Sequence, residues 1–266
     1  MAEVAKEPRR ETRIEVSDGA LIPGKGEKST FSAWRISFFG ALALLIILPI
    51  VHPKPYTEIL LFIPDGVAKT FEVTLLSIAF SVIVGLFTGI GRISRIRIIN
   101  RVATIYVEII RGIPLLVQIF YIYYALGKIV QVPDIMAAVI AMTVCYGAYL
   151  GEIFRAGIQS IPRGQMEAAI ALGLTRSQAL RRVILPQTVR VVLPPLGNEF
   201  IALLKDSSLV SILAVSDLLR RGREYASKTF YYFEALTVVA LVYLVMTLFF
   251  SRLVALMEER MNRRGR

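Results

Sequence analysis

Long apolar runs are the feature that most constrains what this chain can fold into. A helix needs about 20 apolar residues to cross a bilayer core about 30 Å thick, and runs near or above that length recur from residue 34 to residue 256. Inside a bilayer the backbone must satisfy its own hydrogen bonds, so each run is expected to be helical. The mean hydropathy of +0.62 agrees. The sequence therefore predicts an all-α integral membrane protein with about six transmembrane helices.

The polar segments divide the chain around these spans. We expect the spans at residues 34–51, 67–90, 102–126, 135–154, 191–215 and 233–256. Residues 1–33 are a polar tail, residues 155–190 are too polar to cross a bilayer, and residues 258–266 form a basic tail. Most of the 31 Lys and Arg residues lie in these three segments and in the 91–101 loop. Because basic loops stay in the cytoplasm, both termini are predicted to be cytoplasmic. The 214–232 segment departs from this pattern, because it places four basic residues outside.

The composition excludes several classes of function. The net charge is +11, but the arginines lie in short blocks, whereas nucleic-acid binders gather basic residues on one folded face. We therefore expect no nucleic-acid partner. Cys145 is the only cysteine, so no intrachain disulfide can form, and one histidine without a cysteine cluster predicts neither a metal site nor a catalytic triad.

The sequence also lacks a complete nucleotide-binding loop. A P-loop ends in Gly-Lys followed by Ser or Thr. The nearest approach, within residues 19–30, has Gly24-Lys25-Gly26 and Glu27-Lys28-Ser29. We therefore expect this chain to bind no cofactor, and if ATP drives its activity, another polypeptide must bind the ATP.

The 155–190 segment is the most informative part of the sequence. Pro162 and Gly164 break the chain, residues 165–172 are mostly good helix formers, and Gly173 can end that helix. Ser177 is expected to cap a second helix that stops before Pro186. The pattern predicts two short helices with alanine-rich surfaces, which either receive another protein or simply lie on the membrane surface.

Within this segment a family resemblance emerges. Glu167-Ala168-Ala169, then Gly173, then Ile184-Leu185-Pro186 resemble the EAA loop of binding-protein-dependent ABC importer permeases. In that family the loop is a cytoplasmic coupling helix that docks on the ATPase. The resemblance implies that the coupling residues are Gly164, Glu167, Ala168, Ala169, Gly173, Leu185 and Pro186. Met166 departs from the family pattern, in which an aromatic residue is expected.

Other segments are similar to the polar amino-acid permeases of the histidine, arginine, glutamine and glutamate types. They are Glu108-Ile-Ile-Arg111-Gly112-Ile-Pro114-Leu-Leu-Val-Gln118, Glu152-Ile-Phe-Arg155, Ile161-Pro162-Arg163-Gly164-Gln165, and Gly197-Asn198-Glu199-Phe200 with Leu204-Lys205-Asp206-Ser207-Ser208-Leu209. The resemblance covers about residues 67–257, a five-span permease core, so the 34–51 span is an N-terminal addition.

That resemblance also implies partners and a place in the cell. The partners are a cytoplasmic P-loop ATPase dimer that binds ATP and Mg, an extracytoplasmic solute-binding protein, and a second permease subunit in a homodimer or a similar heterodimer. The substrate is an amino acid, membrane lipid surrounds the chain, and the location is the bacterial cytoplasmic (inner) membrane.

Charged residues inside the spans are candidates for the substrate path. Glu199 and Asp206 are seven residues apart, so a helix places both on nearly one face. With Lys205 and Ser207 they could receive the ammonium and carboxylate of an amino acid; the alternative is that they join the two permease halves. Glu108 and Arg111 also share a face, either as a pair that anchors the helix or as ligand contacts. Pro114 should loosen that helix.

Two other function classes compete with an importer subunit. A channel or secondary carrier often shows two related halves with matching broken helices, and this sequence shows one broken span and no clear repeat. A membrane scaffold leaves the 155–190 segment and the in-span charges unexplained. The sequence therefore favours a permease subunit that works by alternating access and performs no covalent chemistry.

Overall fold

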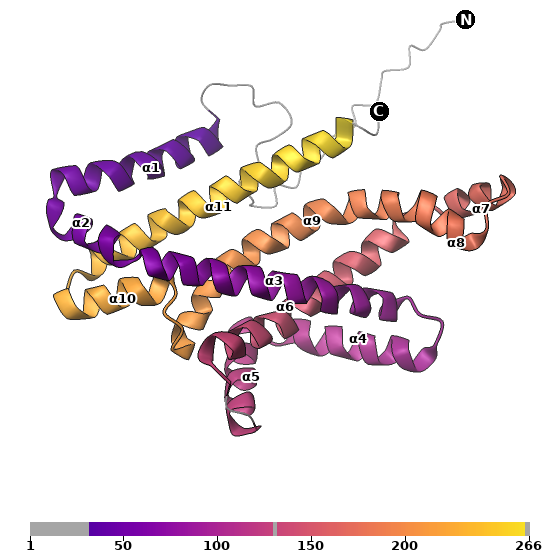
Figure 1. The fold of residues 1–266 in the computed structure, drawn as a ribbon, viewed down its shortest axis with the longest axis horizontal. Helices are drawn as coiled ribbons and strands as arrows, with labels where there is room; N and C mark the ends of the chain where they lie inside the picture. The colour runs from indigo at the N-terminus through magenta and orange to yellow at the C-terminus, as the bar shows by residue number, and fades with distance from the viewer. Residues whose placement is uncertain (1–31, 130–131, 264–266) are drawn as a thin grey trace, which may run out of the picture.

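The computed structural model describes residues 32–129 and 132–263, and it is helical throughout that part of the chain (Figure 1). The polar tail predicted for residues 1–33 and the incomplete P-loop segment lie almost wholly outside the described residues. The elements are α1 Ala33–Val51, α2 Pro53–Phe62, α3 Pro64–Arg92, α4 Arg97–Gly112, α5 Leu115–Ile129, α6 Asp134–Gln159, α7 Arg163–Ala171, α8 Arg176–Ala179, the π-helical turn η1 Leu180–Ile184, α9 Leu185–Asp206, the 3-10 helix η2 Ser207–Leu213, α10 Leu218–Thr229 and α11 Tyr232–Arg263.

The all-α membrane architecture predicted from the sequence is confirmed. In the described part of the chain, α1, α3, α6 and α11 are long and apolar enough to cross a membrane, and α4 with α5 would make a fifth span if the bent pair counts as one. α9, the expected fifth span, has sufficient length but carries Arg190, Glu199, Lys205 and Asp206. The count of six spans therefore stays a prediction.

Helices α3 and α6 are closely packed against each other, because glycines of both helices lie at their contact. We call this contact the glycine seam. The contact glycines, Gly85 and Gly89 of α3 and Gly147 and Gly151 of α6, are spaced four apart. A Cβ atom added to Gly85 would lie 2.5 Å from the Cβ of Leu150, and one added to Gly151 would lie 2.8 Å from the Cγ2 of Thr88. Small residues at this spacing let two membrane helices approach backbone to backbone.

The predicted third span is broken. Instead of one helix over residues 102–126, α4 and α5 meet at an angle of 112°. Ile113, just before Pro114, is extended (φ −109°, ψ 136°), because a proline disfavours helical geometry in the residue that precedes it. Pro114 was expected to loosen the helix, and the structure shows a full corner. The Gln118 amide bonds the carbonyls that this corner exposes, Ile110 O at 2.5 Å and Ile113 O at 2.6 Å.

We expect Gln118→Leu to destabilise the protein by about 1–3 kcal/mol, because two carbonyl groups at the corner lose their donor. Thermal unfolding in detergent would measure the change. Cys145→Ala is the matched control: its Sγ–H donates to Gln118 Oε1 at 3.0 Å, so this variant removes a weak donor but leaves both carbonyl bonds in place. An equal loss of stability in the two variants would contradict the role given to the Gln118 amide.

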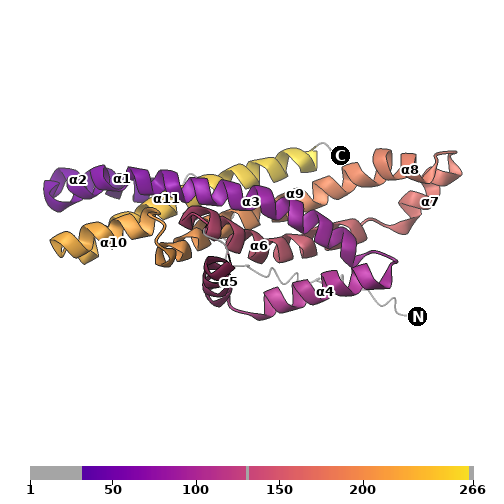
Figure 2. The same cartoon turned by 60° about the horizontal axis from the view of Figure 1, so that its bottom comes forward.

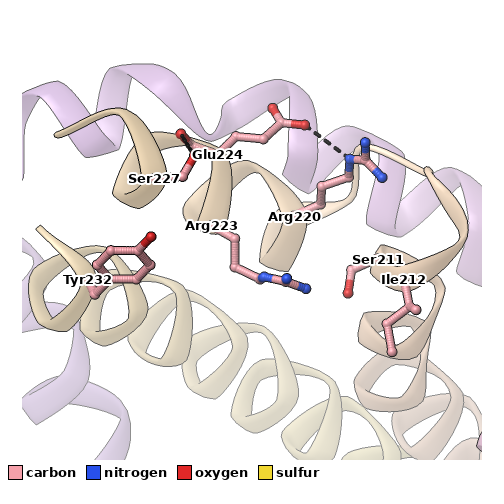
Figure 3. Close-up of a pocket in the computed structure, with 7 residues that line it drawn as sticks. All are labelled: Ser211, Ile212, Arg220, Arg223, Glu224, Ser227 and Tyr232. Carbon is pink, nitrogen blue, oxygen red and sulfur yellow. Dashed lines mark hydrogen bonds and ion pairs between the residues drawn. The ribbon is translucent and has the colours of Figure 1, made fainter. Parts of the chain in front are cut away.

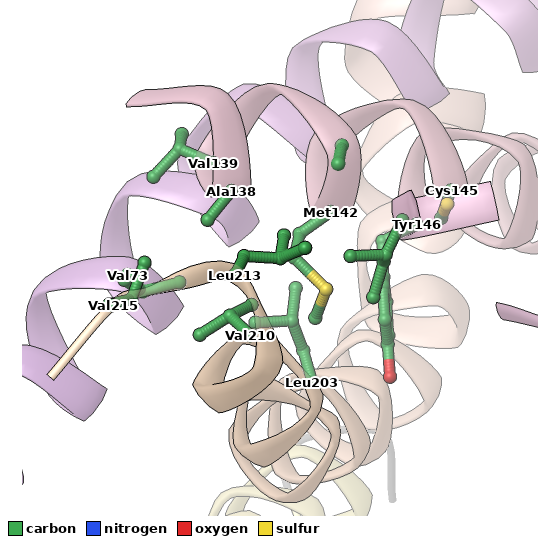
Figure 4. Packing of buried hydrophobic residues seen from close by; sticks show 12 residues of the cluster. Val73, Ala138, Val139, Met142, Cys145, Tyr146, Leu203, Val210, Leu213 and Val215 are labelled. Carbon is green, nitrogen blue, oxygen red and sulfur yellow. The ribbon is translucent and has the colours of Figure 1, made fainter. Parts of the chain in front are cut away.

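Two apolar clusters hold the remaining helices together. One joins α3, α5, α6, α9 and η2 (Figure 4), and its central side chains include Val73, Met142, Leu203 and Leu213. The other joins α2, α9, α10 and α11. α9 contributes to both clusters, which makes it the shared element of the fold.

Helix α1 lies at the periphery. Its Trp34 Nε1 donates to Leu248 O of α11 at 3.0 Å, whereas Ile36, Phe39 and Ile50 are exposed. Apolar side chains exposed along a membrane helix are suited to face lipid. The elongated molecule places α7 and α8 at one end and α2 and α10 at the other (Figures 1 and 2).

Candidate functional site

The predicted coupling segment is a compact helical unit at one end of the molecule. α7 begins directly after Pro162, where proline suits the start of a helix. Buried Ala169, Ala179 and Ile184 lie between α7, α8 and η1. The cap of α8 is Thr175, in a capping box with Gln178, and not Ser177 as the sequence suggested. The unit therefore has its own small core and ordered ends.

Gly173 ends α7 as predicted, and the geometry explains why it is glycine. Its φ is +84°, a left-handed conformation that glycine adopts without steric cost. Leu174 N donates to Ala169 O at 3.2 Å and Gly173 N donates to Ile170 O at 2.9 Å, the two bonds of a Schellman turn.

The second predicted helix does not stop before Pro186. α8 continues through η1 into α9, with Pro186 in the first turn of α9. Proline has no N–H and its ring collides with the carbonyl four residues earlier in a regular helix. The wider π-helical turn lies immediately before it, so the helix passes through without a break. Leu185 and Pro186 thus connect the coupling unit, formed by α7, α8 and η1, directly to the rest of α9.

The outer face of α7 is free among the described residues. Gly164, Glu167, Ala168 and Ile170 are exposed, and Leu172 is 85% exposed. No side-chain hydrogen bond or ion pair engages Glu167 in the described part of the chain. Small and apolar side chains on an exposed helix are typical of a surface that another protein covers.

An ion-pair network lies at the end of α6 nearest the coupling unit. Glu152 binds both Arg92 of α3 and Arg155, and Arg155 Nε donates to Glu152 Oε2 at 3.0 Å. Asn100 of α4 donates to Arg92 O. The network ties α3, α4 and α6 together next to the segment that leads into α7.

Charged residues of the predicted spans lie around two tyrosines of α6. Tyr146 Oη donates to Asp206 Oδ2 at 2.7 Å. The Tyr146 and Tyr149 rings are 5.9 Å apart, and the Arg111 guanidinium lies 5.8 Å from the centre of the Tyr149 ring. Half-buried Glu199 lies seven residues before Asp206, on nearly the same face of α9. The structure thus brings together three of the six predicted path residues: Glu199, Asp206 and Arg111.

The other three path candidates lie elsewhere. Lys205 is exposed, and Ser207 is buried with its hydroxyl donating to Leu204 O at 2.8 Å. Glu108 is exposed, and no N–O distance within 4.0 Å pairs it with Arg111 among the described residues. The sequence analysis missed Tyr146 and Tyr149. The available signal was two hydroxyl-bearing rings, three residues apart, in a helix otherwise rich in small residues.

At the opposite end, buried Asp217 caps α10. It accepts from Arg220 N at 3.0 Å and Leu219 N at 3.3 Å, and Tyr243 Oη donates to it at 3.4 Å. Burial raises the pKa of the Asp217 carboxyl to about 6, although these hydrogen bonds lower it. The cap is therefore a carboxyl group that titrates within the ordinary range of working pH.

We expect Asp217 to make stability depend on pH. An unfolded Asp has a pKa of about 3.9, so the folded state binds this proton more tightly and the free energy of unfolding falls by about 3 kcal/mol as pH rises from about 4 to about 6. Asp217→Asn keeps a hydrogen-bond acceptor at the cap but has no titrating carboxyl group, so its stability should lack this pH dependence. Melting temperatures of both proteins across that range test the expectation, and parallel curves would contradict it.

Comparison with known proteins decides the family. Residues 81–263 match the model of the binding-protein-dependent transport system inner membrane component. The chain belongs to this family. The permease is therefore a multi-pass membrane subunit of an ABC importer, a transporter rather than an enzyme, and ATP binding in such importers belongs to a separate subunit. The matched residues contain the coupling unit and the whole polar cluster, which consists of Arg111, Tyr146, Tyr149, Glu199 and Asp206.

Relatives of similar length support the assignment. The permease is 38% identical over 201 residues to the glutamine transport system permease protein GlnP of Escherichia coli K12, covering 74% of this chain and 92% of GlnP. It is 40% identical over 204 residues to the L-cystine transport system permease protein TcyB of Bacillus subtilis, covering 74% and 86%.

A solved structure supports the fold. The crystal structure of an amino acid ABC transporter with histidines matches with a TM-score of 0.71 and 43% identity, covering 77% of this chain and 95% of that chain. The family model begins at residue 81, so α1, α2 and more than half of α3 lie before it.

Proposed function

We propose that this permease imports a polar amino acid by alternating access, driven by a cytoplasmic P-loop ATPase that docks on α7. The observation that carries the proposal is the coupling unit itself. Its helix α7 is ordered and has an exposed face, and its helix α8, against which α7 packs, continues through η1 into α9 without a break. α9 carries Glu199 and Asp206, so a push on α7 would pass to α8 and η1, against which α7 packs, and from there along continuous helix to the polar cluster. The proposed coupling residues are Gly164, Glu167, Ala168, Ala169, Gly173, Leu185 and Pro186.

The partners follow from the family and from the described surfaces. We propose an ATPase dimer that holds ATP and Mg, a solute-binding protein at the end that carries α10, and a second permease subunit, either identical or similar. The coupling unit and both termini would lie in the cytoplasm, with the chain in the bacterial inner membrane. Residues 67–257 would form the permease domain, and residues 34–51 would be an added helix.

The substrate class rests on the relatives and on the polar cluster. GlnP and TcyB are named for glutamine and L-cystine, which makes a polar amino acid the reasonable cargo. Two carboxylates, Glu199 and Asp206, beside Arg111 and two tyrosine hydroxyls can bind an ammonium group and orient a zwitterion. This cluster, rather than Lys205, Ser207 or Glu108, is the proposed contact with the cargo.

A pull-down from native membranes tests the proposal. Wild-type permease should recover a P-loop ATPase, and Gly173→Asp should not, because a negative charge is placed at the exposed turn of the docking face. Gly173→Asn is the matched control: asparagine has nearly the same shape and tolerates positive φ about as well as aspartate, so it reports any strain without the charge. Failure of folded wild type to recover an ATPase would overturn the proposal.

A further inference from the structure

The basic residues of the 214–232 segment need a reason to lie at the end opposite the coupling unit, because basic residues favour the cytoplasmic side. Three of the four have a partner within the protein. Arg220 Nε binds Glu224 at 3.0 Å, Arg221 binds Asp65 and Glu224 at 3.0 Å each, and the Lys228 ammonium lies 5.6 Å from the centre of the Phe62 ring. Arg223 alone has neither an ion pair nor a cation–π contact among the described residues.

Arg223 lines a pocket of about 420 Å³ between α10, η2 and the start of α11 (Figure 3). The pocket-lining residues are Ser211, Ile212, Arg220, Arg223, Glu224, Ser227 and Tyr232. Figure 3 shows the Arg223 side chain extending toward Ser211. Ser211 is only 4% exposed, and its hydroxyl has no hydrogen-bond partner in the described part of the chain.

The charges around the pocket favour an anion. Its one carboxylate, Glu224, already accepts from both Arg220 and Arg221. Burial would raise the pKa of Glu224, but these two arginines outweigh it and hold the pKa below its usual value. A free guanidinium with a hydroxyl donor beside it matches the two oxygens of a carboxylate.

The position of the pocket favours a cargo molecule over a surface ion. Ser211 belongs to η2, which begins directly after Asp206. Five residues of 3-10 helix span about 10 Å, so the pocket lies about one amino acid length from the polar cluster. Along the chain, the arginine of the pocket and the carboxylates of the cluster therefore lie on either side of η2.

We propose that this pocket is an entry site in which Arg223 and Ser211 hold the α-carboxylate of the incoming amino acid. The site rests on the proposed function for its cargo and its side of the membrane. The ammonium end then leads toward Asp206 and Glu199, so the cargo enters amino group first. The pocket recognises the backbone part that all α-amino acids share, and selectivity for the side chain is left to the deeper cluster.

Protection from chemical labelling tests the entry site in the intact permease–ATPase complex in lipid nanodiscs. Cys145 is buried and is the only cysteine, so Cys145→Ser with Ser227→Cys places one reactive thiol at the pocket. The probes are L-glutamine and L-histidine, each compared with its carboxamide, which keeps the side chain and the ammonium but lacks the carboxylate. At twice its Kd an amino acid should slow maleimide labelling about threefold, and the carboxamide should not.

Two further variants identify the group responsible. Adding Arg223→Gln should abolish the protection, whereas Lys228→Gln, a basic residue of the same helix that does not line the pocket, should keep it. Arg223 is exposed, so its loss should not prevent folding, and Arg223→Lys should restore part of the protection. Equal protection by acid and carboxamide, or protection that survives Arg223→Gln, would overturn the entry site.

The remaining outcomes are also decisive. Protection by a solute-binding protein but by neither amino acid would reassign the pocket to an acidic side chain of that partner, and protection by nothing would remove the site. Uptake by the same complex in vesicles distinguishes failure of the entry site from failure of the proposed function. Wild type that imports an amino acid without protection contradicts only the entry site, and wild type that imports nothing contradicts the proposed function.

Discussion

Gly85→Ala is expected to remove most of the folded permease from the membrane. The new Cβ would lie 2.5 Å from the Cβ and 3.0 Å from the backbone carbon of Leu150. A backbone atom cannot rotate away as a side chain can. The helices α3 and α6 must therefore move apart along the glycine seam. Overpacking of this kind costs about 1–3 kcal/mol in soluble cores, and we expect the upper end here because Gly89, Gly147 and Gly151 lose their contacts as well.

Size-exclusion chromatography of a fluorescent fusion, compared at equal expression, measures the effect as a loss of the monodisperse peak. Gly40→Ala is the matched control, because a Cβ there meets nothing within 4 Å and alanine favours a helix over glycine. If Gly85→Ala and Gly40→Ala gave the same peak, the close approach of α3 and α6 would be contradicted.

The second large effect is expected at the polar cluster. Glu199→Gln should lower amino-acid uptake and cargo-stimulated ATP hydrolysis by about tenfold or more, because a hydrogen bond from the cargo ammonium to a charged carboxylate contributes about 1.5–3 kcal/mol. Assembly with the ATPase should survive, since glutamine has the same size. Transport assays with purified complexes in vesicles, together with the yield of complex, separate the two effects.

Lys205→Gln is the informative comparison for Glu199→Gln. Lys205 is exposed and lies six residues after Glu199 in the same helix. The Lys205→Gln variant should therefore leave uptake nearly unchanged. Loss of assembly in Glu199→Gln would favour the alternative that this carboxylate joins two permease halves. Equal losses of uptake in both variants would contradict the assignment of the cluster.

Prediction from the sequence succeeded where one helix decides the outcome. The seven-residue spacing of Glu199 and Asp206 correctly placed both near one set of groups, because helical periodicity alone fixes that relation. Gly173 was likewise identified from its position after a run of helix formers. Lys205 and Ser207 lie apart from this cluster because adjacent residues point in different directions on a helix, and the sequence does not say which direction faces the partner helices.

Pro114 and Pro186 show that the effect of a proline on a helix cannot be predicted from the local sequence alone. Pro114 makes a corner of 112°, whereas the helix passes through Pro186. Both lack an N–H, but only Pro186 follows a π-helical turn that widens the helix, and only the corner at Pro114 has Gln118 from the next helix to bond the freed carbonyls. The glycine seam and the roles of Tyr146 and Tyr149 were missed for the same reason, since each depends on a second helix whose placement no spacing rule supplies.

The glycine seam has a mechanical consequence for α6. A helix locked to its neighbour backbone to backbone cannot slide, so α6 can move only as a stiff lever that carries α3 with it. Its 26 residues give an arm about 39 Å long. A tilt of about 10° around its outer end would swing the end that joins α7 by about 7 Å and would shift Tyr146, near its midpoint, by about 3 Å. A displacement of that size exceeds the 2.7 Å length of the hydrogen bond from Tyr146 to Asp206, so a small rotation of α6 relative to α9 is enough to open this contact.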